Sequence, residues 1–291
     1  MKNYMGIDIG GTNIKGALVT SKGEIIRQHS LPTDSREGSS TVIDNICRCI
    51  SVLGPEGAAS IGLGCPGPLD PVTGVVIHTP NLPLKNTPLR QIVAKKFRLP
   101  VYLDNDANCF ILGEATFGAG IGLANVVGIT LGTGIGSGAY LNGIYRGRGS
   151  GMEFGHTTID YLGPAGKCNN NCIEELLSAR GIMRMARQRE LSADSPKQIN
   201  ILAKKGNPEA VALWRYYGIT LGIAITNLVN IFDPDLVVIG GRIANAWPFF
   251  GRSLKETVLK RSILRPPKIA RTKLGIRAGI LGAAAMGMRT I

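Results

Sequence analysis

The sequence predicts an α/β protein made of two related domains, and three observations support this prediction. Short apolar runs that suit buried strands alternate along the chain with longer segments whose apolar residues recur at helical spacing. The pattern of glycines and apolar residues at positions 6–11 recurs at positions 128–133, which is an internal repeat. The length of 291 residues is enough for two domains of ordinary size.

The elements are assigned from apolar periodicity and from turn residues. Helices are expected where apolar residues share one face, as Trp214, Tyr217 and Leu221 do, at residues 39–53, 87–97, 107–117, 208–232 and 279–288, with a further apolar-periodic stretch at 173–191. Strands are expected at short apolar runs bounded by turn residues, at residues 4–9, 14–19, 24–31, 61–64, 74–78, 100–103, 126–131, 137–141, 236–239 and 268–274.

The composition is that of a globular chain without a targeting or membrane segment. It is 44% hydrophobic with 39 glycines, and no apolar run reaches the length of a membrane span. The N-terminus leads directly into a predicted strand and lacks the features of a signal peptide, so we expect a cytoplasmic protein with no membrane partner. The six cysteines are too scattered for a disulfide framework, which suits a reducing compartment.

The formal net charge is +13, and much of it lies near the C-terminus. Between Gly251 and Arg277, nine Lys or Arg residues accompany one acidic residue, Glu256. Such a basic face could attract nucleic acid or raise the local concentration of an anionic substrate such as ATP. No nucleic-acid-binding motif accompanies it, so we favour a solvated basic face that binds no DNA specifically.

The first two predicted strands are joined by a glycine turn that suits phosphate. Gly10 and Gly11 let backbone N–H groups approach phosphate oxygens, and Thr12 and Lys15 add a hydroxyl group and a positive charge. Asp8 would lie beside the phosphates, where a carboxylate is useful if Mg²⁺ intervenes through water. A plain hairpin turn would also explain the glycines.

The repeat supplies a second turn of the same kind, formed by Gly132, Thr133, Gly134 and Gly136. An ATP phosphate tail held between the two hairpins is the simplest interpretation. Farther along, Gly240 and Gly241 follow a buried strand and would permit close approach of adenosine, although a simple strand-to-helix turn also explains them.

The strand at residues 100–103 ends in a polar pentapeptide, residues 104–108, where we place the chemistry. A helix is predicted to begin directly afterwards, so Asp106 lies at or near its N-cap, a position that Asp also occupies for structural reasons. Because α/β sheets bind ligands outside the carboxyl ends of their strands, we expect a functional role for Asp106 and the adjacent Asn105.

Residues 151–178 combine carboxylates, an imidazole and thiols in a short stretch. His156, Cys168 and Cys172 offer the ligand types that zinc prefers, although such residues are often only packing residues. Glu153 and Glu174 would flank a metal-braced His156, and ionised carboxylates accept hydrogen bonds from hydroxyl groups. The stretch therefore predicts a cradle for a polyol or sugar, braced by Zn²⁺.

Taken together, these motifs resemble those of the ROK family, which contains sugar kinases and sugar-sensing repressors. The matching segments are Asp8–Lys15, GCPGPLD at 64–70, PNLP at 80–83, DNDAN at 104–108, LGTGIGSG at 131–138, EFGH at 153–156, CIE at 172–174 and NIFDPDLVVIGG at 230–241. Two departures concern the zinc loop: the first family cysteine falls on Gly166, and the loop is one residue short. Only His156, Cys168 and Cys172 of four usual ligands therefore remain. A third departure is Arg242, where a third glycine is usual.

The resemblance implies two actin-like ATPase (ribonuclease H-like) domains with a central cleft. The small N-terminal domain would cover residues 1–118 and be completed by the last helix, about 278–291, while the large C-terminal domain would cover 119–277. It further implies a homodimer.

The activity implied is that of an ATP-dependent hexose kinase that uses ATP and Mg²⁺. Asp106 would be the general base, and the sugar would be bound by Asn105, Glu153, His156 and Glu174, with Gly67 and Asn81 as weaker candidates. Glucose O6 is the first expectation for the acceptor, and N-acetylmannosamine or N-acetylglucosamine is the alternative.

The competing functional class is a sugar-sensing transcriptional regulator. Such regulators carry a helix-turn-helix segment ahead of the first strand, and only seven residues precede Asp8.

Overall fold

A computed structural model describes residues 2–147, 151–163 and 171–288. The chain divides into two compact units, each built from several segments. Unit 1 contains residues 1–124, 138–152 and 272–291, and unit 2 contains residues 125–137 and 153–271. The domain boundaries expected from the sequence, after residues 118 and 277, stay predictions.

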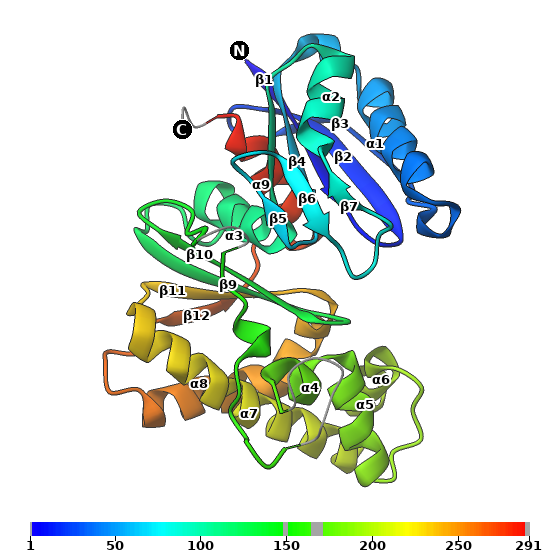
Figure 1. The fold of residues 1–291 in the computed structure, drawn as a ribbon. Coiled ribbons are helices and arrows are strands. Elements are labelled where there is room, and N and C mark those ends of the chain that lie inside the picture. Colours follow the sequence, from blue (N-terminus) through cyan, green and yellow to red (C-terminus); the bar gives the residue numbers. More distant parts are fainter. Residues whose placement is uncertain (1, 148–150, 164–170, 289–291) are drawn as a thin grey trace. The chain divides into compact units, whose positions relative to one another are not determined.

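Unit 1 is built on a mixed five-stranded sheet with the order β3-β2-β1-β4-β8 (Figure 1). The central strand β1 pairs antiparallel with β2 and parallel with β4, and β4 pairs parallel with β8. The strands are β1 (Asn3–Ile9), β2 (Asn13–Thr20), β3 (Ile25–Pro32), β4 (Ala58–Cys65) and β8 (Val101–Asn105). A smaller sheet contains β5 (Leu69–Asp70), β6 (Val75–His78) and β7 (Lys85–Thr87).

Helices cover both faces of this five-stranded sheet. Side chains alternate along a strand, so Ile7 contributes to the core shared with α1 while its neighbour Gly6 faces α9. One face is covered by α1 (Ser39–Leu53) and α2 (Leu89–Phe97), the other by α3 (Asp106–Phe117) and α9 (Ala278–Met286). Short 3₁₀ turns are η1 (Ser35–Glu37), η2 (Pro55–Gly57) and η5 (Gly275–Arg277).

The helix α9 packs against its neighbours at backbone distance, because glycines stand at the contact points. A Cβ atom at Gly62 of β4 would lie 1.8 Å from the carbonyl oxygen of Ala283 in α9. One at Gly282 of α9 would lie 1.7 Å from the carbonyl oxygen of Cys109 in α3. No side chain fits in either gap, so the contact fixes α9 closely between β4 and α3.

Unit 2 is built on a sheet with the order β10-β9-β11-β12, in which β11 pairs parallel with both neighbours. The strands are β9 (Asn125–Leu131), β10 (Ile135–Leu141), which continues into unit 1, β11 (Leu236–Gly240) and β12 (Lys268–Arg271). The helical elements are η3 (Phe154–His156), α4 (Ile173–Leu177), α5 (Ala179–Gln188), α6 (Pro196–Lys204), α7 (Pro208–Phe232), η4 (Arg242–Ala246) and α8 (Trp247–Arg261).

The core of unit 2 is organised by aromatic contacts between α7 and α8. The rings of Trp214 and Tyr217 on α7 both lie against Phe250 on α8, with the Tyr217 and Phe250 ring centroids 5.3 Å apart in an edge-on arrangement. The Tyr217 hydroxyl donates to the Leu177 carbonyl oxygen at 3.0 Å, which ties the end of α4 to this core.

The internal repeat predicted from the sequence corresponds to a repeated arrangement. In unit 1, β1 and β2 are sheet neighbours and the later strand β4 pairs parallel with β1; in unit 2, β9 and β10 are neighbours and β11 pairs parallel with β9. The predicted ranges of α1 and α7 are confirmed. The apolar-periodic stretch from residue 173 is two helices, α4 and α5, separated at Ser178.

Two helices, α6 and α8, were not predicted, although α8 buries Phe250, Leu254 and Val258 at helical spacing. Among the described residues, no helix combines the length and the apolar character needed to cross a membrane.

The glycine contacts of α9 give a stability prediction. Gly282→Ala should destabilise the protein by about 1–3 kcal/mol, because the new methyl group must displace the Cys109 carbonyl or the whole of α9. Thermal or urea unfolding measures the change. Gly57→Ala is the matched control, since its Cβ meets no atom within 4 Å. Equal stability of the two variants would contradict the close packing of α9.

Candidate active site

The parallel strands of unit 1 bring a row of residues to one sheet edge. Asp8 of β1 is paired in register with Gly64 of β4, and Gly64 with Asp104 of β8. All three strands end within two residues of this row, so the row lies at the carboxyl edge of the sheet. This is the edge at which α/β sheets bind ligands, and the row therefore defines the candidate site in unit 1.

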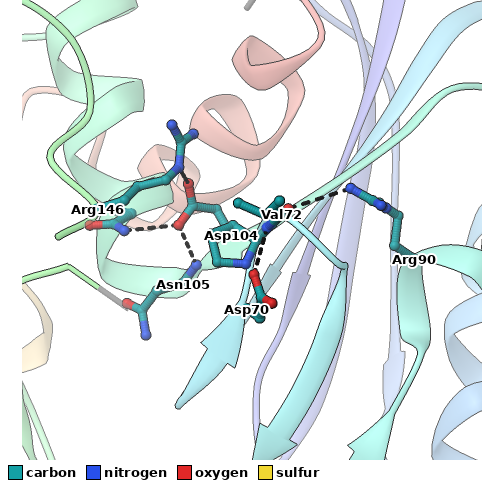
Figure 2. A network of polar contacts seen from close by, with 8 residues as sticks. Asp70, Val72, Arg90, Asp104, Asn105 and Arg146 are labelled. Atoms are coloured by element: carbon teal, nitrogen blue, oxygen red, sulfur yellow. Dashed lines mark hydrogen bonds and ion pairs between the residues drawn. The ribbon is translucent and has the colours of Figure 1, made fainter. Parts of the chain in front are cut away.

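Asp104 is buried and fully engaged by hydrogen bonds, as Figure 2 shows. Its Oδ2 lies 2.7 Å from Nε of Arg146, and its Oδ1 accepts from the Asn105 N–H and from Nδ2 of Asn108, each at 2.8 Å. An ion pair and two further donors occupy both oxygens of this carboxylate. Asp104 therefore serves to position the pentapeptide rather than to accept a proton.

The importance of Arg146 could not be predicted from the sequence. It lies 42 positions after Asp104, beyond β10, in a stretch without an ion-pair pattern that would have pointed to it. Only the folded chain brings its guanidinium group to the pentapeptide.

The N-cap of α3 is Asn105, whereas the sequence placed Asp106 at or near this position. The Asn105 side chain accepts from the Ala107 N–H at 2.8 Å, which is the usual N-cap contact. Asp106 is the first residue of the helix, and its Oδ1 shares the same N–H at 2.9 Å. Since Asn105 caps the helix and the Asp106 side chain is exposed, the structural explanation for Asp106 is weakened.

The carboxyl groups of Asp8 and Asp106 have raised pKa values. Desolvation raises the pKa of Asp8 to about 6, the charge of Asp106 adds to this shift, and Lys15 opposes it. Desolvation by the surrounding protein also raises the pKa of Asp106, against hydrogen bonds from the Ala107 N–H and its own N–H. Both groups favour the proton more than free carboxyls do.

The first glycine turn is held by side chains from the segment after β3. The Thr33 hydroxyl donates to the Gly10 carbonyl oxygen at 2.6 Å, and the Ser35 hydroxyl donates to that of Gly11 at 3.3 Å. The Thr33 N–H donates to the Thr12 carbonyl oxygen at 2.9 Å. With these carbonyl groups engaged, the N–H groups of Gly11 and Thr12 make no hydrogen bond within the described part of the chain. Such groups can bind an anion.

Asn81 and Lys15 also lie at this turn. Gly67 lies on a different loop, between β4 and β5. A Cβ atom at Gly11 would be 3.2 Å from Cβ of Asn81, so Asn81 packs directly on the turn. Lys15 is the register partner of Asp8 across the hairpin. Gly67 precedes β5, where Asp70 accepts from the Val72 N–H at 2.8 Å and shapes the small sheet (Figure 2).

In unit 2, the second glycine turn is braced by Glu174. The Ile135 N–H donates to Oε2 of Glu174 at 2.8 Å, and a Cβ atom at Gly134 would lie 2.6 Å from the same oxygen. The Gly132 carbonyl oxygen accepts from the Ala179 N–H at 2.9 Å. The start of α4 and the start of α5 therefore hold this turn, which includes Thr133 and ends at Gly136 in β10. One carboxylate oxygen of Glu174 is committed to the turn.

Gly240 and Gly241 lie beside the second turn in unit 2. Gly240 pairs with Thr130 of β9, and Gly241 has a positive φ of 83°. A Cβ atom at Gly241 would lie 2.2 Å from the carbonyl oxygen of Leu131, directly before the turn. The two glycine segments expected to bind nucleotide are thus neighbours.

Glu153 and His156 lie together at η3, which is anchored to β10. The His156 Nε2 is 3.9 Å from Oε2 of Glu153, and both side chains are substantially exposed. The Phe154 N–H between them donates to the Ser137 hydroxyl at 3.1 Å, which anchors η3 to β10. Glu153 and His156 are therefore held next to β10, the strand that follows the second glycine turn.

The predicted metal ligands are only partly within the described residues. Thr158 forms a β-bridge with Cys172, and the Ile173 N–H donates to the Thr157 carbonyl oxygen at 2.9 Å, so the segment after His156 runs beside buried Cys172. Cys168 lies outside the described residues. Among the residues that are described, no group of three His, Cys, Asp or Glu side chains could hold a metal ion.

Comparison with known proteins agrees with this geometry. The sequence profile of the ROK family matches residues 4–289. A glucokinase from Thermotoga maritima is 34% identical over 97% of this chain and 96% of its own length. A xylose repressor from Caldicellulosiruptor bescii is 32% identical over 98% of this chain and 77% of its own length. The structure of a ROK family glucokinase from Streptomyces griseus, in complex with glucose and AMPPNP, superposes with a TM-score of 0.83 at 30% identity and covers 98% of both chains.

The raised pKa of Asp8 predicts how stability depends on pH. A carboxyl group whose pKa rises from 3.8 to about 6 on folding binds more protons in the folded state, so stability falls as pH rises through this range. The full shift corresponds to about 3 kcal/mol. Asp8→Asn should therefore raise the melting temperature at pH 8 in a chelator, and the gain should shrink as the pH is lowered towards 4.

Thermal melts at several pH values measure this dependence. Asp44→Asn, which removes an exposed carboxylate on α1 of the same unit, is the control and should give no comparable gain. A gain for Asp8→Asn that does not vary with pH would mean that ionisation of Asp8 does not oppose folding.

Proposed function

Because the chain belongs to the ROK family, we propose that it is an ATP-dependent hexose kinase, which transfers the γ-phosphoryl group of ATP to a sugar hydroxyl group. The observation that carries this proposal is the arrangement of carboxylates at the carboxyl edge of unit 1. Asp104 is saturated by Arg146 and two other donors, while Asp106 presents an exposed carboxyl group at the start of α3.

Asp106 is proposed as the general base. A base works best when its pKa lies near the working pH, and desolvation raises the pKa of Asp106 from its ordinary value towards that range. The N-terminus of α3 limits this rise, because N–H groups there stabilise the ionised form. Asp106 accepts the proton of the attacking hydroxyl group, and the remaining demands of phosphoryl transfer are positioning and charge neutralisation.

The nucleotide is assigned to the glycine segments of both units. In unit 1 the outward N–H groups of Gly11 and Thr12 suit phosphate oxygens, and in unit 2 the braced turn at Gly132–Gly136 has the same chemistry. Gly240 and Gly241 are proposed to receive adenosine.

Asp8 and Asp106 also fit Mg²⁺, because a cation between two neighbouring carboxylates would offset their mutual repulsion. When bound, Mg²⁺ would neutralise phosphate charge.

The sugar is assigned to Asn105, Glu153, His156 and Glu174, with Gly67 and Asn81 as further candidates. The exposed pair of Glu153 and His156 supports this assignment, since a carboxylate and an imidazole can together bind adjacent hydroxyl groups. Within the described residues, Oε2 of Glu174 braces the second turn and Oε1 accepts no hydrogen bond, so Oε1 is assigned to the ligand. Glucose O6 is proposed as the acceptor, with N-acetylmannosamine or N-acetylglucosamine as the alternative.

The second candidate function is a sugar-sensing regulator, because a xylose repressor is nearly as similar in sequence as the glucokinase. A regulator needs to bind sugar but does not need a base. The two functions therefore differ in whether Asp106 supports turnover.

The homodimer, the cytoplasmic location and the lack of specific DNA binding stay predictions.

A panel of hexoses in a coupled ADP-release assay tests the proposal. We expect Asp106→Asn to retain sugar binding, measured by calorimetry, but to lower kcat by roughly a hundredfold or more, the usual contribution of a positioned base. Asp44→Asn should keep full turnover. Sugar binding without turnover of any hexose by the unaltered protein would favour the regulator, and full turnover of Asp106→Asn would place the base elsewhere.

We further propose that His156, Cys168 and Cys172 bind one structural zinc ion per chain, with water or another side chain as the fourth ligand. Support comes from the pairing of Thr157–Thr158 with Cys172–Ile173, which brings the segment of His156 alongside a buried thiol. The ion would fix the loop ahead of α4 and orient His156. The alternative is a metal-free loop, held by contacts such as that of Asn171 with the Tyr161 carbonyl oxygen.

Elemental analysis of the purified protein distinguishes these alternatives. We expect about one zinc per chain, and we expect Cys172→Ala to lose both the metal and sugar affinity, since the loop and His156 would no longer be fixed. Cys47→Ala, a buried cysteine change on α1, is the control and should retain the metal. Well under one zinc per chain, with full activity in chelator, would contradict the proposal.

A further inference from the structure

Glu114 is a completely buried carboxylate that lies outside the reacting groups considered so far. It stands in α3, eight residues after Asp106, which is about 12 Å along the helix axis. None of the ion pairs formed by the described residues includes it. A buried carboxyl group without a cationic partner is tolerated only when its oxygens accept hydrogen bonds.

Four hydrogen-bond donors supply this compensation. Oε2 accepts from the Ala119 N–H at 2.8 Å and from the Lys273 N–H at 3.3 Å. Oε1 accepts from the Leu274 N–H at 2.9 Å and from the Thr272 hydroxyl group. The three backbone N–H contacts require acceptors on both oxygens of Glu114. A carboxylate therefore suits the position, and an amide, whose NH₂ group would face an N–H donor, does not.

The donors come from two segments that are far apart in the sequence. Ala119 follows the end of α3, shortly before the chain leaves unit 1. Residues 272–274 begin the segment that returns to unit 1, and they lead through η5 directly into α9. The carboxyl group of Glu114 therefore joins the end of α3 to the start of the η5–α9 helical run through hydrogen bonds.

These two helices carry or support both carboxyl groups of the candidate site. The first residue of α3 is Asp106. On α9, a Cβ atom at Gly279 would lie 3.5 Å from Cγ of Asp8, so the backbone of α9 backs the Asp8 side chain. Gly113, beside Glu114, approaches α9 so closely that its Cβ would lie 2.2 Å from the Ala278 carbonyl oxygen.

We propose that Glu114 is a positioning residue for catalysis: by joining α3 to the start of α9, it fixes the placement of Asp106 relative to Asp8. This inference rests on the proposed function, because it concerns the use of Asp106 in phosphoryl transfer. Glu114 itself touches no reacting group. A small shift of a catalytic group is enough to lower turnover strongly while the substrates still bind.

The test is the division of the effect between kcat and KM. Glu114→Gln keeps the shape of the side chain but turns an NH₂ group towards N–H donors. It should lower kcat by about tenfold or more while the KM values for hexose and ATP change by less than about threefold. Gly118→Ala should have a similar effect from the other side, because its Cβ would lie 2.3 Å from Oε2 of Glu114.

Two control variants separate positioning from general stability. Val42→Ala removes buried volume from α1 on the opposite face of the same sheet, and it should lower the melting temperature without lowering kcat well below that temperature. Thr272→Ser keeps the hydroxyl donor and should retain nearly full turnover.

Wild-type kcat in Glu114→Gln, or a loss of kcat in Val42→Ala that matches it at an equal thermal shift, would overturn the positioning role. Failure of the unaltered protein to phosphorylate any hexose would instead count against the proposed function, so the two failures are distinguishable.

Discussion

The contact of α9 with β4 and α3 at backbone distance is the constraint on which the rest of unit 1 depends. Glycines replace side chains at Gly62 and Gly282, so neighbouring backbones approach to distances that no methyl group could occupy. This packing tolerates no added side-chain atoms, and it therefore also fixes the positions of the helix ends. Asp106 begins α3, and the backbone of α9 supports Asp8. The geometry of the candidate site is thus a consequence of close packing well away from it.

Three aspartates at one sheet edge have different roles because their surroundings differ. Asp104 forms an ion pair with Arg146 and accepts hydrogen bonds from two further donors. Asp8 is desolvated and lies near another carboxylate, and Asp106 is desolvated but also bonded to helix N–H groups. Chemical identity alone does not separate these residues. The proposed division into a structural anchor, a partner for a cation and a base follows from the neighbours that the fold supplies.

Local patterns predicted most of the fold, and long-range contacts account for what they missed. The strands around both glycine turns, the ranges of α1 and α7 and the internal repeat follow from periodicity and turn residues, which are local properties. The pentapeptide pointed to Asp106 through its place at a strand end. By contrast, Arg146 and Glu114 act through partners 42 and about 160 positions away. Nothing local marks such partners. The helix α8 was missed although its buried residues Phe250, Leu254 and Val258 recur at helical spacing.

The place of α9 in the sequence has a consequence for biosynthesis. A ribosome completes unit 2 before it makes α9, so the sheet face around Gly62 and the inner side of α3 have no cover while the nascent chain grows. Exposed apolar surface on a partly made chain favours chaperone binding or aggregation. Unit 1 can therefore close only after the nascent chain has passed through the whole of unit 2. The side chain of Asp8, which the backbone of α9 supports, takes its final place only when α9 has joined the sheet.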